Sequence, residues 1–492
     1  MNYRSTRGTA PEMSISQAII KGIAADGGLY VPEKFPQLSC DWETLSKLSY
    51  KELAKEVLKG YLDNFTEDEL DHCIDGAYTN KFEAEEVVPV VKAGLADFAE
   101  LYHGPTAAFK DMALSLMPYL LTVSIRKEGE EKTVVILVST SGDTGMAALK
   151  GFENVPGTEV VVFFPDGAVS PVQERQMRTA EGKNAHVFSI YGNFDDAQTT
   201  QKKILNDKEF AEEMDKVGIR FSAANSMNIG RLIPQIVYYV WGYLRMMERG
   251  EIKAGEPINI TVPSGNFGNI LSAYYAYRMG LPVKKFICAS NKNKVLTDFF
   301  NTGVYDTHRD FYVTNAPSMD ILVSSNLERL LYHLSGDGKY IAELMDALNK
   351  GGHYEVRPEV KEAMGIFAAG YSDENEVIDT IGRLYKENGY LIDTHTAVAY
   401  SVYEKYRKES GDETPCLIAS TASPYKFVAA VSSAIGLAKE ADDFRQIESL
   451  NKLTGVRIPS GLKDLDKREI IHNTAIEKEE MKDRIRNEFK RS

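Results

Sequence analysis

The feature that most constrains the fold of this chain is a regular alternation of short apolar runs, polar loops and helical stretches, which begins near residue 87. Each run is rich in Val, Ile and Phe, and a loop of Gly, Ser, Thr or Asn follows it. This order is typical of βαβ units and predicts an α/β protein with a parallel sheet. The clearest strand candidates are residues 133–139, 159–165, 186–190, 258–263, 285–290 and 416–420.

The two ends of the chain have different patterns. Residues 1–86 show apolar spacing typical of helices, as in SISQAIIKGIA, and we expect a mostly helical N-terminal segment there. The stretch from residue 461 onward is so rich in charged residues that we expect an exposed terminal helix, with a partner-binding helix as the alternative.

Composition narrows the classes of function. The 492 residues carry 57 Lys and Arg against 71 Asp and Glu, and the net charge of −14 would repel nucleic acid and anionic membranes. The four cysteines are isolated, and no His or Cys spacing suggests a metal site. The N-terminus lacks the apolar region of a signal peptide, and no apolar run is long enough to span a bilayer. We therefore expect a cytoplasmic protein with no metal, nucleic-acid or membrane partner.

A candidate anion-binding loop, PSGNFGN at 263–269, follows one of the predicted strands and leads directly into a helical stretch. Its glycines let the backbone approach a ligand, and a helix N-terminus offers unpaired N–H groups. The loop lacks the Gly-Lys-Ser/Thr of a nucleotide-binding P-loop. It suits a small phosphate ester held by backbone donors, and an ordinary Gly-rich turn is the alternative.

Three further loops are expected at the same sheet edge, where ligands of α/β proteins bind. TSGDTG at 140–145 surrounds two glycines with hydroxyl and carboxylate groups, and forms either a carboxylate-binding nest or a simple helix cap. Lys110 follows apolar residues, where partial burial would lower its pKa and free its amine to attack a carbonyl. Thr421 offers a hydroxyl to a ring nitrogen or caps a helix. A Schiff-base lysine, a phosphate cradle and a ring-nitrogen partner together match what pyridoxal phosphate requires.

Through these loops the chain resembles the threonine synthase family, which are pyridoxal-phosphate enzymes of fold type II. The resemblance implies two parallel-sheet α/β lobes with the site between them. We expect the smaller lobe at 87–222, with the Lys110 and TSGDTG loops, and the larger lobe at 223–492, with the phosphate loop and the charged C-terminal helix. The motifs that carry the resemblance are YRSTRG (3–8), DGGLYVPE (26–33), HGPTAAFKD (103–111), TSGDTG (140–145), GNFDDAQ (192–198), NSMNIGR (225–231), PSGNFGN (263–269), SMDILVSSNLERL (318–330) and STASPYKF (420–427).

The resemblance also implies roles for individual residues. Lys110 would carry the cofactor, Asp143 would face its ring hydroxyl and Thr421 its ring nitrogen. The remaining residues fall into a cofactor-phosphate group of Gly265, Asn266, Phe267, Gly268 and Asn269, a substrate-carboxylate group of Thr140, Ser141, Gly142 and Thr144, and a substrate-phosphate group of Asn225, Ser226 and Arg231. Where relatives have S-T-A-H-P, this chain has Ser423, which leaves the role of that histidine open.

The implied reaction converts O-phospho-L-homoserine and water to L-threonine and phosphate. The alternatives within the fold are a phospho-lyase that stops after elimination and a serine or threonine dehydratase. The alternative that is not an enzyme is a non-catalytic scaffold that retains the fold. The residues do not decide between a monomer and a homodimer.

Overall fold

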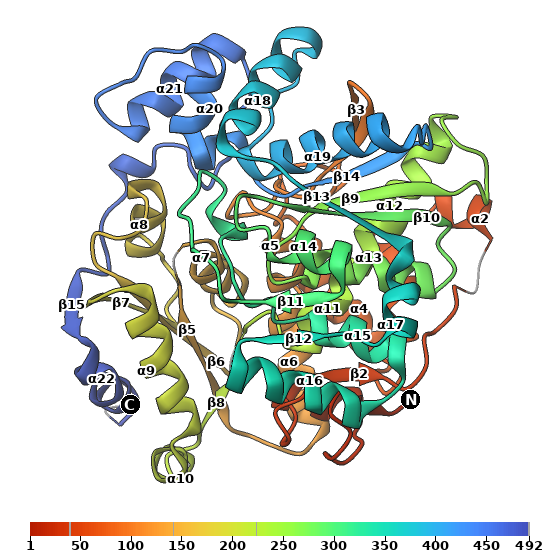
Figure 1. Ribbon diagram of the computed structural model, residues 1–492. Coiled ribbons are helices and arrows are strands. Elements are labelled where there is room, and N and C mark those ends of the chain that lie inside the picture. Colours follow the sequence, from red (N-terminus) through yellow and green to blue (C-terminus); the bar gives the residue numbers. More distant parts are fainter. Residues whose placement is uncertain (39–40, 141, 223, 491–492) are drawn as a thin grey trace.

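Two sheet-based lobes make up most of the molecule, and the N-terminal helices pack against them (Figure 1). The computed structural model describes residues 1–38, 41–140, 142–222 and 224–490. The expected α/β class with two sheet-based lobes is confirmed. The six strand candidates named from the sequence all lie within or form strands of these two sheets.

The larger sheet has six strands in the order β13-β10-β9-β14-β4-β3, and only the β3–β4 pair is antiparallel. Side chains of β10 alternate between two cores: Phe286 and Cys288 face one cluster, and Ile287 and Ala289 the other. This alternation is the two-residue period of a strand covered on both faces. The strands are β3 (Val90–Ala93), β4 (Ala96–Glu100), β9 (Ile258–Pro263), β10 (Val283–Ser290), β13 (Phe367–Tyr371) and β14 (Cys416–Ser420).

Helices cover both faces of the larger sheet (Figure 1). One face carries α19 (Thr394–Ser410), backed by α18 (Glu374–Asn388), α20 (Val428–Ala434) and α21 (Asp443–Thr454). The other face carries α12 (Ile236–Glu248), α13 (Gly268–Arg278) and α14 (Val295–Thr302). The lobe also contains α5 (Lys110–Leu114), α6 (Met117–Lys127), α11 (Ile229–Leu232), α15 (Leu327–Ser335), α16 (Gly338–Gly351), α17 (Pro358–Ala363), β11 (Val304–Asp306), β12 (His353–Glu355), η1 (Ile233–Gln235), η2 (Pro317–Met319), η3 (Met364–Ile366) and η4 (Pro424–Phe427).

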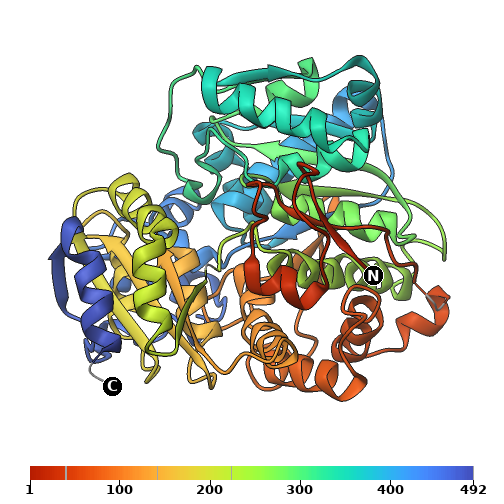
Figure 2. The same cartoon turned by 90° about the horizontal axis from the view of Figure 1, so that it is seen from below.

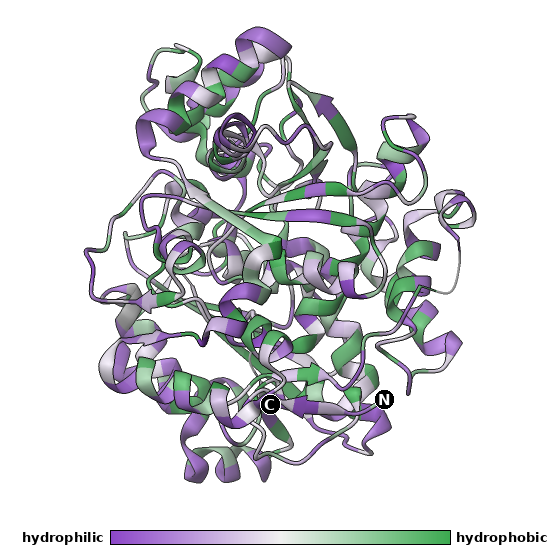
Figure 3. Ribbon diagram, turned by 45° about the vertical axis from the view of Figure 1, so that its right-hand side comes forward, coloured by the Kyte–Doolittle hydropathy of each residue, from purple (hydrophilic) through white to green (hydrophobic). Residues whose placement is uncertain are grey.

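The smaller sheet has five parallel strands in the order β15-β7-β6-β5-β8. Its strands are β5 (Thr133–Ser139), β6 (Thr158–Pro165), β7 (Ala185–Tyr191), β8 (Ile219–Ser222) and β15 (Thr474–Glu477). Its helices are α7 (Asp143–Gly151), α8 (Pro171–Arg178), α9 (Phe194–Asn206), α10 (Lys208–Asp215) and α22 (Met481–Phe489), with η5 (Leu465–Lys467) and η6 (Lys478–Glu480). In Figure 3, green hydrophobic segments lie mainly in the interior of the molecule, and purple hydrophilic segments are frequent on the outer helices and loops.

The membership of the two sheets differs from the expected lobe ranges of 87–222 and 223–492. Strands β3 and β4 lie in the larger sheet, because β4 pairs with β14 in parallel register, with Ile418 opposite Phe98. At the other end of the chain, β15 pairs with β7 and adds a strand to the smaller sheet. The chain therefore crosses between the lobes at both ends of the segment 129–222, an order that strand patterns alone do not reveal.

The expectation of an exposed C-terminal helix is wrong in one respect. Helix α22 buries Met481, Ile485 and Phe489 against the outer face of the smaller sheet, and Figure 2 shows the C-terminal segment in dark blue on that side. These residues recur at every fourth position, which places them on one helix face. The surrounding charges concealed this stripe in the sequence.

The N-terminal segment is mostly helical, as expected, and also contains a small antiparallel pair. Strands β1 (Tyr3–Ser5) and β2 (Tyr30–Pro32) pair, and the helices are α1 (Ile15–Lys21), α2 (Trp42–Ser46), α3 (Tyr50–Leu58) and α4 (Glu67–Tyr78). Ser14, Ser49 and Thr66 each form a capping box that begins a helix. Among the described residues, no helix is both long and apolar enough to cross a membrane.

Candidate active site

Lys110 is the first residue of α5 and lies where the loop after β4 meets the loop after β14. Phe109 N donates to Thr421 O at 2.8 Å, and Ser423 N donates to Ala107 O at 3.0 Å. These backbone bonds fasten the two loops together, so that Lys110 and Thr421 share one end of the larger sheet. This is the carboxyl edge of the parallel strands, as the sequence predicted.

The Asp143 carboxylate is the common partner of the charged and polar side chains around Lys110. Its Oδ2 lies 3.5 Å from Lys110 Nζ and accepts a 3.3 Å bond from Ser318 Oγ. Its Oδ1 lies 2.7 Å from Lys426 Nζ and accepts a 3.0 Å bond from Gln173 Nε2. Asp143 starts α7 of the smaller lobe, whereas both lysines and Ser318 belong to the larger lobe. The carboxylate therefore joins the two lobes at the site.

Burial sets the protonation of these groups. Burial lowers the pKa of the Lys110 amine; Asp143 opposes this shift, while Arg231 and Lys426 add to it. For Asp143, burial alone would raise the pKa, but Lys426 and Lys110 outweigh it and hold the pKa well below its usual range. The site thus contains a firmly ionised carboxylate beside an amine that loses its proton readily.

The loop at 263–269 has the form of an anion cradle. No backbone N–H of residues 265–269 has a hydrogen-bond acceptor among the described residues. Phe267 adopts a left-handed conformation with φ of 64°, and α13 begins at the next residue without a side-chain cap. Asn269 Oδ1 accepts a 2.7 Å bond from Tyr238 Oη, while its buried Nδ2 has no partner in the part of the chain that the structure describes. A helix start with free donors and an unsatisfied buried amide is suited to an anion.

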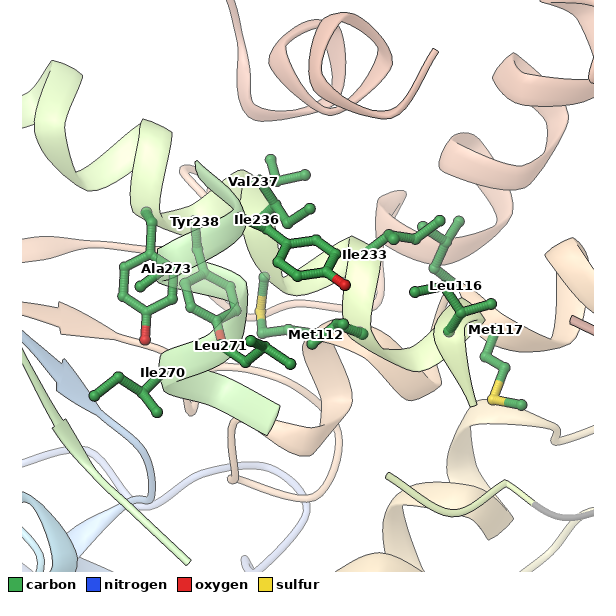
Figure 4. Close-up of a cluster of buried hydrophobic side chains, with 14 of the residues drawn as sticks. Met112, Leu116, Met117, Ile233, Ile236, Val237, Tyr238, Ile270, Leu271 and Ala273 are labelled. Atoms are coloured by element: carbon green, nitrogen blue, oxygen red, sulfur yellow. The ribbon is translucent and has the colours of Figure 1, made fainter. Parts of the chain in front are cut away.

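A single apolar cluster supports both Lys110 and the cradle (Figure 4). Met112 of α5 belongs to it together with Ile233 of η1, Tyr238 of α12 and Leu271 of α13. Because close-packed cores deform little, this cluster fixes the separation between Lys110 and the helix that follows the cradle.

A second set of polar residues, from the loop at 225–231, adjoins the cradle. Ser226 Oγ lies 3.2 Å from Ser325 Oγ, which donates at 3.2 Å to Asn266 Oδ1. Met227 O and Asn326 Oδ1 both accept bonds of 2.6 Å from the fully buried Arg329. These bonds hold the three loops together.

Arg231 is buried without an anionic partner. Its Nη1 donates to Ala224 O at 2.8 Å, and no carboxylate pairs with it in the described part of the chain. Burial lowers the pKa of Arg231 to about 10, which still leaves it charged. A buried, unpaired guanidinium near Lys110 is costly to the fold unless an anion compensates it.

The TSGDTG loop agrees only in part with the expectation. The Thr140 hydroxyl accepts from Gly142 N at 2.9 Å and from Gly145 N at 3.1 Å, and it donates to Gly142 O at 3.0 Å. These three bonds use its full hydrogen-bonding capacity. Thr140 therefore shapes the loop rather than offering its hydroxyl to a substrate. The expected contact through Ser141 lies outside the described residues, whereas Thr144 is partly exposed at the start of α7.

Three residues that bind Asp143 were given no role in the sequence analysis: Lys426, Gln173 and Ser318. The Lys426 side chain is completely buried, although lysines are almost never buried without a partner. Its flanking residues Tyr425 and Phe427 are the only sequence signal of that burial. Gln173 comes from α8, and nothing near it in sequence marks it. Among the described residues, no group of three His, Cys, Asp or Glu side chains could hold a metal ion.

Three family models match the chain in succession. Residues 2–78 match the N terminus of threonine synthase, residues 99–421 match the pyridoxal-phosphate-dependent enzyme family, and residues 396–482 match the C-terminal part of threonine synthase. The second match contains Lys110, Asp143, the cradle and Thr421.

Individual proteins match over most of the chain. The threonine synthase of Schizosaccharomyces pombe is 37% identical over 469 residues, which cover 88% of this chain and 89% of that protein. Human threonine synthase-like 1 is 40% identical over 434 residues, but these cover 85% of this chain and only 58% of the human protein. This chain thus spans little more than half the length of that relative. A crystal structure of threonine synthase from Brucella melitensis with pyridoxal phosphate bound superimposes with a TM-score of 0.89 at 34% identity over the whole of both chains.

Proposed function

Because this chain belongs to the threonine synthase family of pyridoxal-phosphate-dependent enzymes, we propose that it converts O-phospho-L-homoserine and water to L-threonine and phosphate. The observation that carries the proposal is the pairing of two anion sites around one amine. The cradle at 265–269 offers free backbone donors, and Arg231 offers a buried, unpaired guanidinium. The reaction needs one site for the cofactor phosphate, which stays, and one for the substrate phosphate, which leaves.

The residues fit pyridoxal phosphate. The unpartnered Nδ2 of Asn269 and the free amides beside it would hold the phosphate. Gly265 lets the cradle pack closely against the backbone of residues 318 and 319, since a Cβ there would lie 3.0 Å from Ser318 O. Lys110 supplies the amine that binds the aldehyde, and the Thr421 hydroxyl, which has no partner among the described residues, would face the ring nitrogen. The group, once bound, supplies an electron sink that stabilises negative charge next to the substrate amine.

Lys110 is the proposed general base. With the substrate amine bound in its place, the free Lys110 amine would take the proton from the substrate α carbon, give that proton up, and then take one from the β carbon as the phosphate leaves the γ carbon. After water has added at the β carbon, the same amine returns a proton at the α carbon. Burial keeps water away from it, since its side chain is only 12% exposed.

The proposed role of Arg231, Asn225 and Ser226 is to hold the substrate phosphate until it departs. Arginine suits a phosphate because its planar fork can donate two parallel hydrogen bonds. The amide of Thr144, which has no acceptor among the described residues, would take the substrate carboxylate at the start of α7, while the Thr140 hydroxyl holds the Gly142 amide and keeps the loop in shape.

An assay with O-phospho-L-homoserine tests the proposal. Threonine and inorganic phosphate should appear in equal amounts with the holoenzyme. Phosphate with 2-oxobutyrate and no threonine would instead identify a lyase that stops after elimination. Release of neither product, from protein that has bound the cofactor, would contradict the proposal.

Gly265→Ala is expected to weaken pyridoxal phosphate binding about tenfold, or about 1.4 kcal/mol. The added Cβ would lie 3.0 Å from Ser318 O and 3.4 Å from Met319 Cα, and these backbone atoms have little freedom to move. Equilibrium titration of visible absorbance measures the affinity. Gly365→Ala is the matched control, because a Cβ there meets no atom within 4 Å. Equal affinities in the two variants would show that the cradle does not hold the cofactor.

A further inference from the structure

Lys426 is a second buried lysine that the proposed mechanism does not use. It lies in η4, the turn that follows β14, and its side chain is fully buried. Its Nζ contacts two oxygens, Asp143 Oδ1 at 2.7 Å and Thr106 O at 3.0 Å. Burial of an ammonium group costs several kcal/mol unless it is paired, so this geometry indicates a charged Lys426 held by one carboxylate.

The two lysines share the Asp143 carboxylate unequally. Lys426 is 0.8 Å closer to it than Lys110 is, since the contacts measure 2.7 Å and 3.5 Å. A contact of 3.5 Å is at the limit of a hydrogen bond, whereas 2.7 Å is typical of a strong charge-assisted one. The negative charge of Asp143 is therefore largely balanced by Lys426.

We propose that Lys426 is a positioning residue, which binds the Asp143 carboxylate and thereby leaves Lys110 as an uncharged amine that can react with a carbonyl. The inference rests on the proposed function, because it concerns how Lys110 becomes reactive. It differs from that function in assigning a task to Lys426, to which the proposed mechanism gives no contact with substrate or cofactor.

Charge balance supports this assignment. The charged groups that face Lys110 are Asp143 from α7, Arg231 from α11 and Lys426 from η4. The carboxylate of the neighbouring Asp111 already accepts two hydrogen bonds from Thr106, from its N at 2.8 Å and from its Oγ1 at 2.7 Å. With one carboxylate against two fixed cations, a proton on Lys110 would add a third positive charge to a buried site. Without Lys426, Asp143 would instead become the partner of protonated Lys110.

The test measures the reactivity of Lys110 directly. Full-length protein freed of cofactor is mixed with pyridoxal phosphate over a range of pH, trapped with borohydride, and the modified Lys110 peptide is quantified by mass spectrometry. In Lys426→Met, the midpoint pH of capture should rise by about one unit or more. In the double variant Lys426→Met with Asp143→Asn, it should return to the wild-type value or below. The pH profile of turnover should shift in the same direction.

Two further variants keep the test decisive. Lys426→Gln retains a donor for Thr106 O and gives the same upward shift if the Met variant does not fold. Lys405→Met is the matched control: Lys405 also contacts one carboxylate, Glu376 at 2.6 Å, and one carbonyl, Tyr371 O at 2.9 Å, but lies away from the site. An unchanged midpoint in the folded Lys426 variants would overturn the inference and leave the proposed function intact. Wild-type protein that captures no pyridoxal phosphate at Lys110 would overturn both.

Discussion

Lys110→Ala is expected to lower kcat/KM for O-phospho-L-homoserine by about 10³-fold or more, because a positioned acid–base group alone contributes about 10²- to 10⁴-fold. The same variant should lose the covalent bond to the cofactor, and with it the visible absorbance that borohydride bleaches. No described residue offers a second amine at this position, since the nearby Lys426 is held by Asp143 and Thr106. Steady-state kinetics and absorbance spectra of the purified variant measure both effects.

The control for this prediction is Lys150→Ala in α7. Lys150 pairs at 2.8 Å with Glu153, which lies just beyond the end of the helix, and is partly exposed. Its variant should keep both colour and turnover. If Lys110→Ala retains full turnover, then Lys110 is not the base and the mechanism proposed above is wrong.

Arg231→Ala is expected to raise KM for the phosphorylated substrate about 10²- to 10⁴-fold. A charge-assisted hydrogen bond contributes about 1.5–3 kcal/mol, and the guanidinium fork can make two of them with a phosphate. Cofactor absorbance should change little, since the cradle at 265–269 binds the other phosphate. Kinetics at varied substrate concentration and a cofactor titration of the same preparation separate the two effects.

Two further measurements test this prediction: the KM of the Arg231→Lys variant and competition by inorganic phosphate. The lysine variant keeps a charge but loses the fork, so its KM should lie between those of wild type and Arg231→Ala. Inorganic phosphate should compete with the substrate in wild type and lose this effect in Arg231→Ala. An unchanged KM, or a cofactor affinity that falls in parallel, would assign Arg231 to the cofactor phosphate or to the fold.

The strands and the ligand-binding edge of the sheets could be predicted because their signals are local. Residues 133–139 and 258–263 are apolar runs of strand length, and the structure gives β5 and β9 the same bounds. The loops with Lys110, Asp143 and Gly265 follow strands, and the carboxyl ends of parallel strands share an edge. Each of these inferences needs only neighbouring residues.

What the sequence did not reveal depends on contacts between distant residues. The pairing of β4 with β14 joins segments more than 300 residues apart, so the boundary of the lobes could not be drawn from strand patterns. The contact of Lys426 with Asp143 joins segments separated by a comparable distance in the chain. In the TSGDTG loop, the backbone fold rather than the residue types decides that the Thr140 hydroxyl bonds to Gly142 and Gly145.

A crystal structure of the protein grown with pyridoxal phosphate tests the central claim most directly, namely that Lys110 and the 265–269 loop hold the two ends of one cofactor. The account predicts continuous electron density from Lys110 Nζ to the cofactor ring, with the phosphate within hydrogen-bonding distance of the free amides of residues 265–269 and of Asn269 Nδ2. Density that joins the cofactor to Lys426, or a phosphate seated at Arg231 instead of the loop, would contradict it.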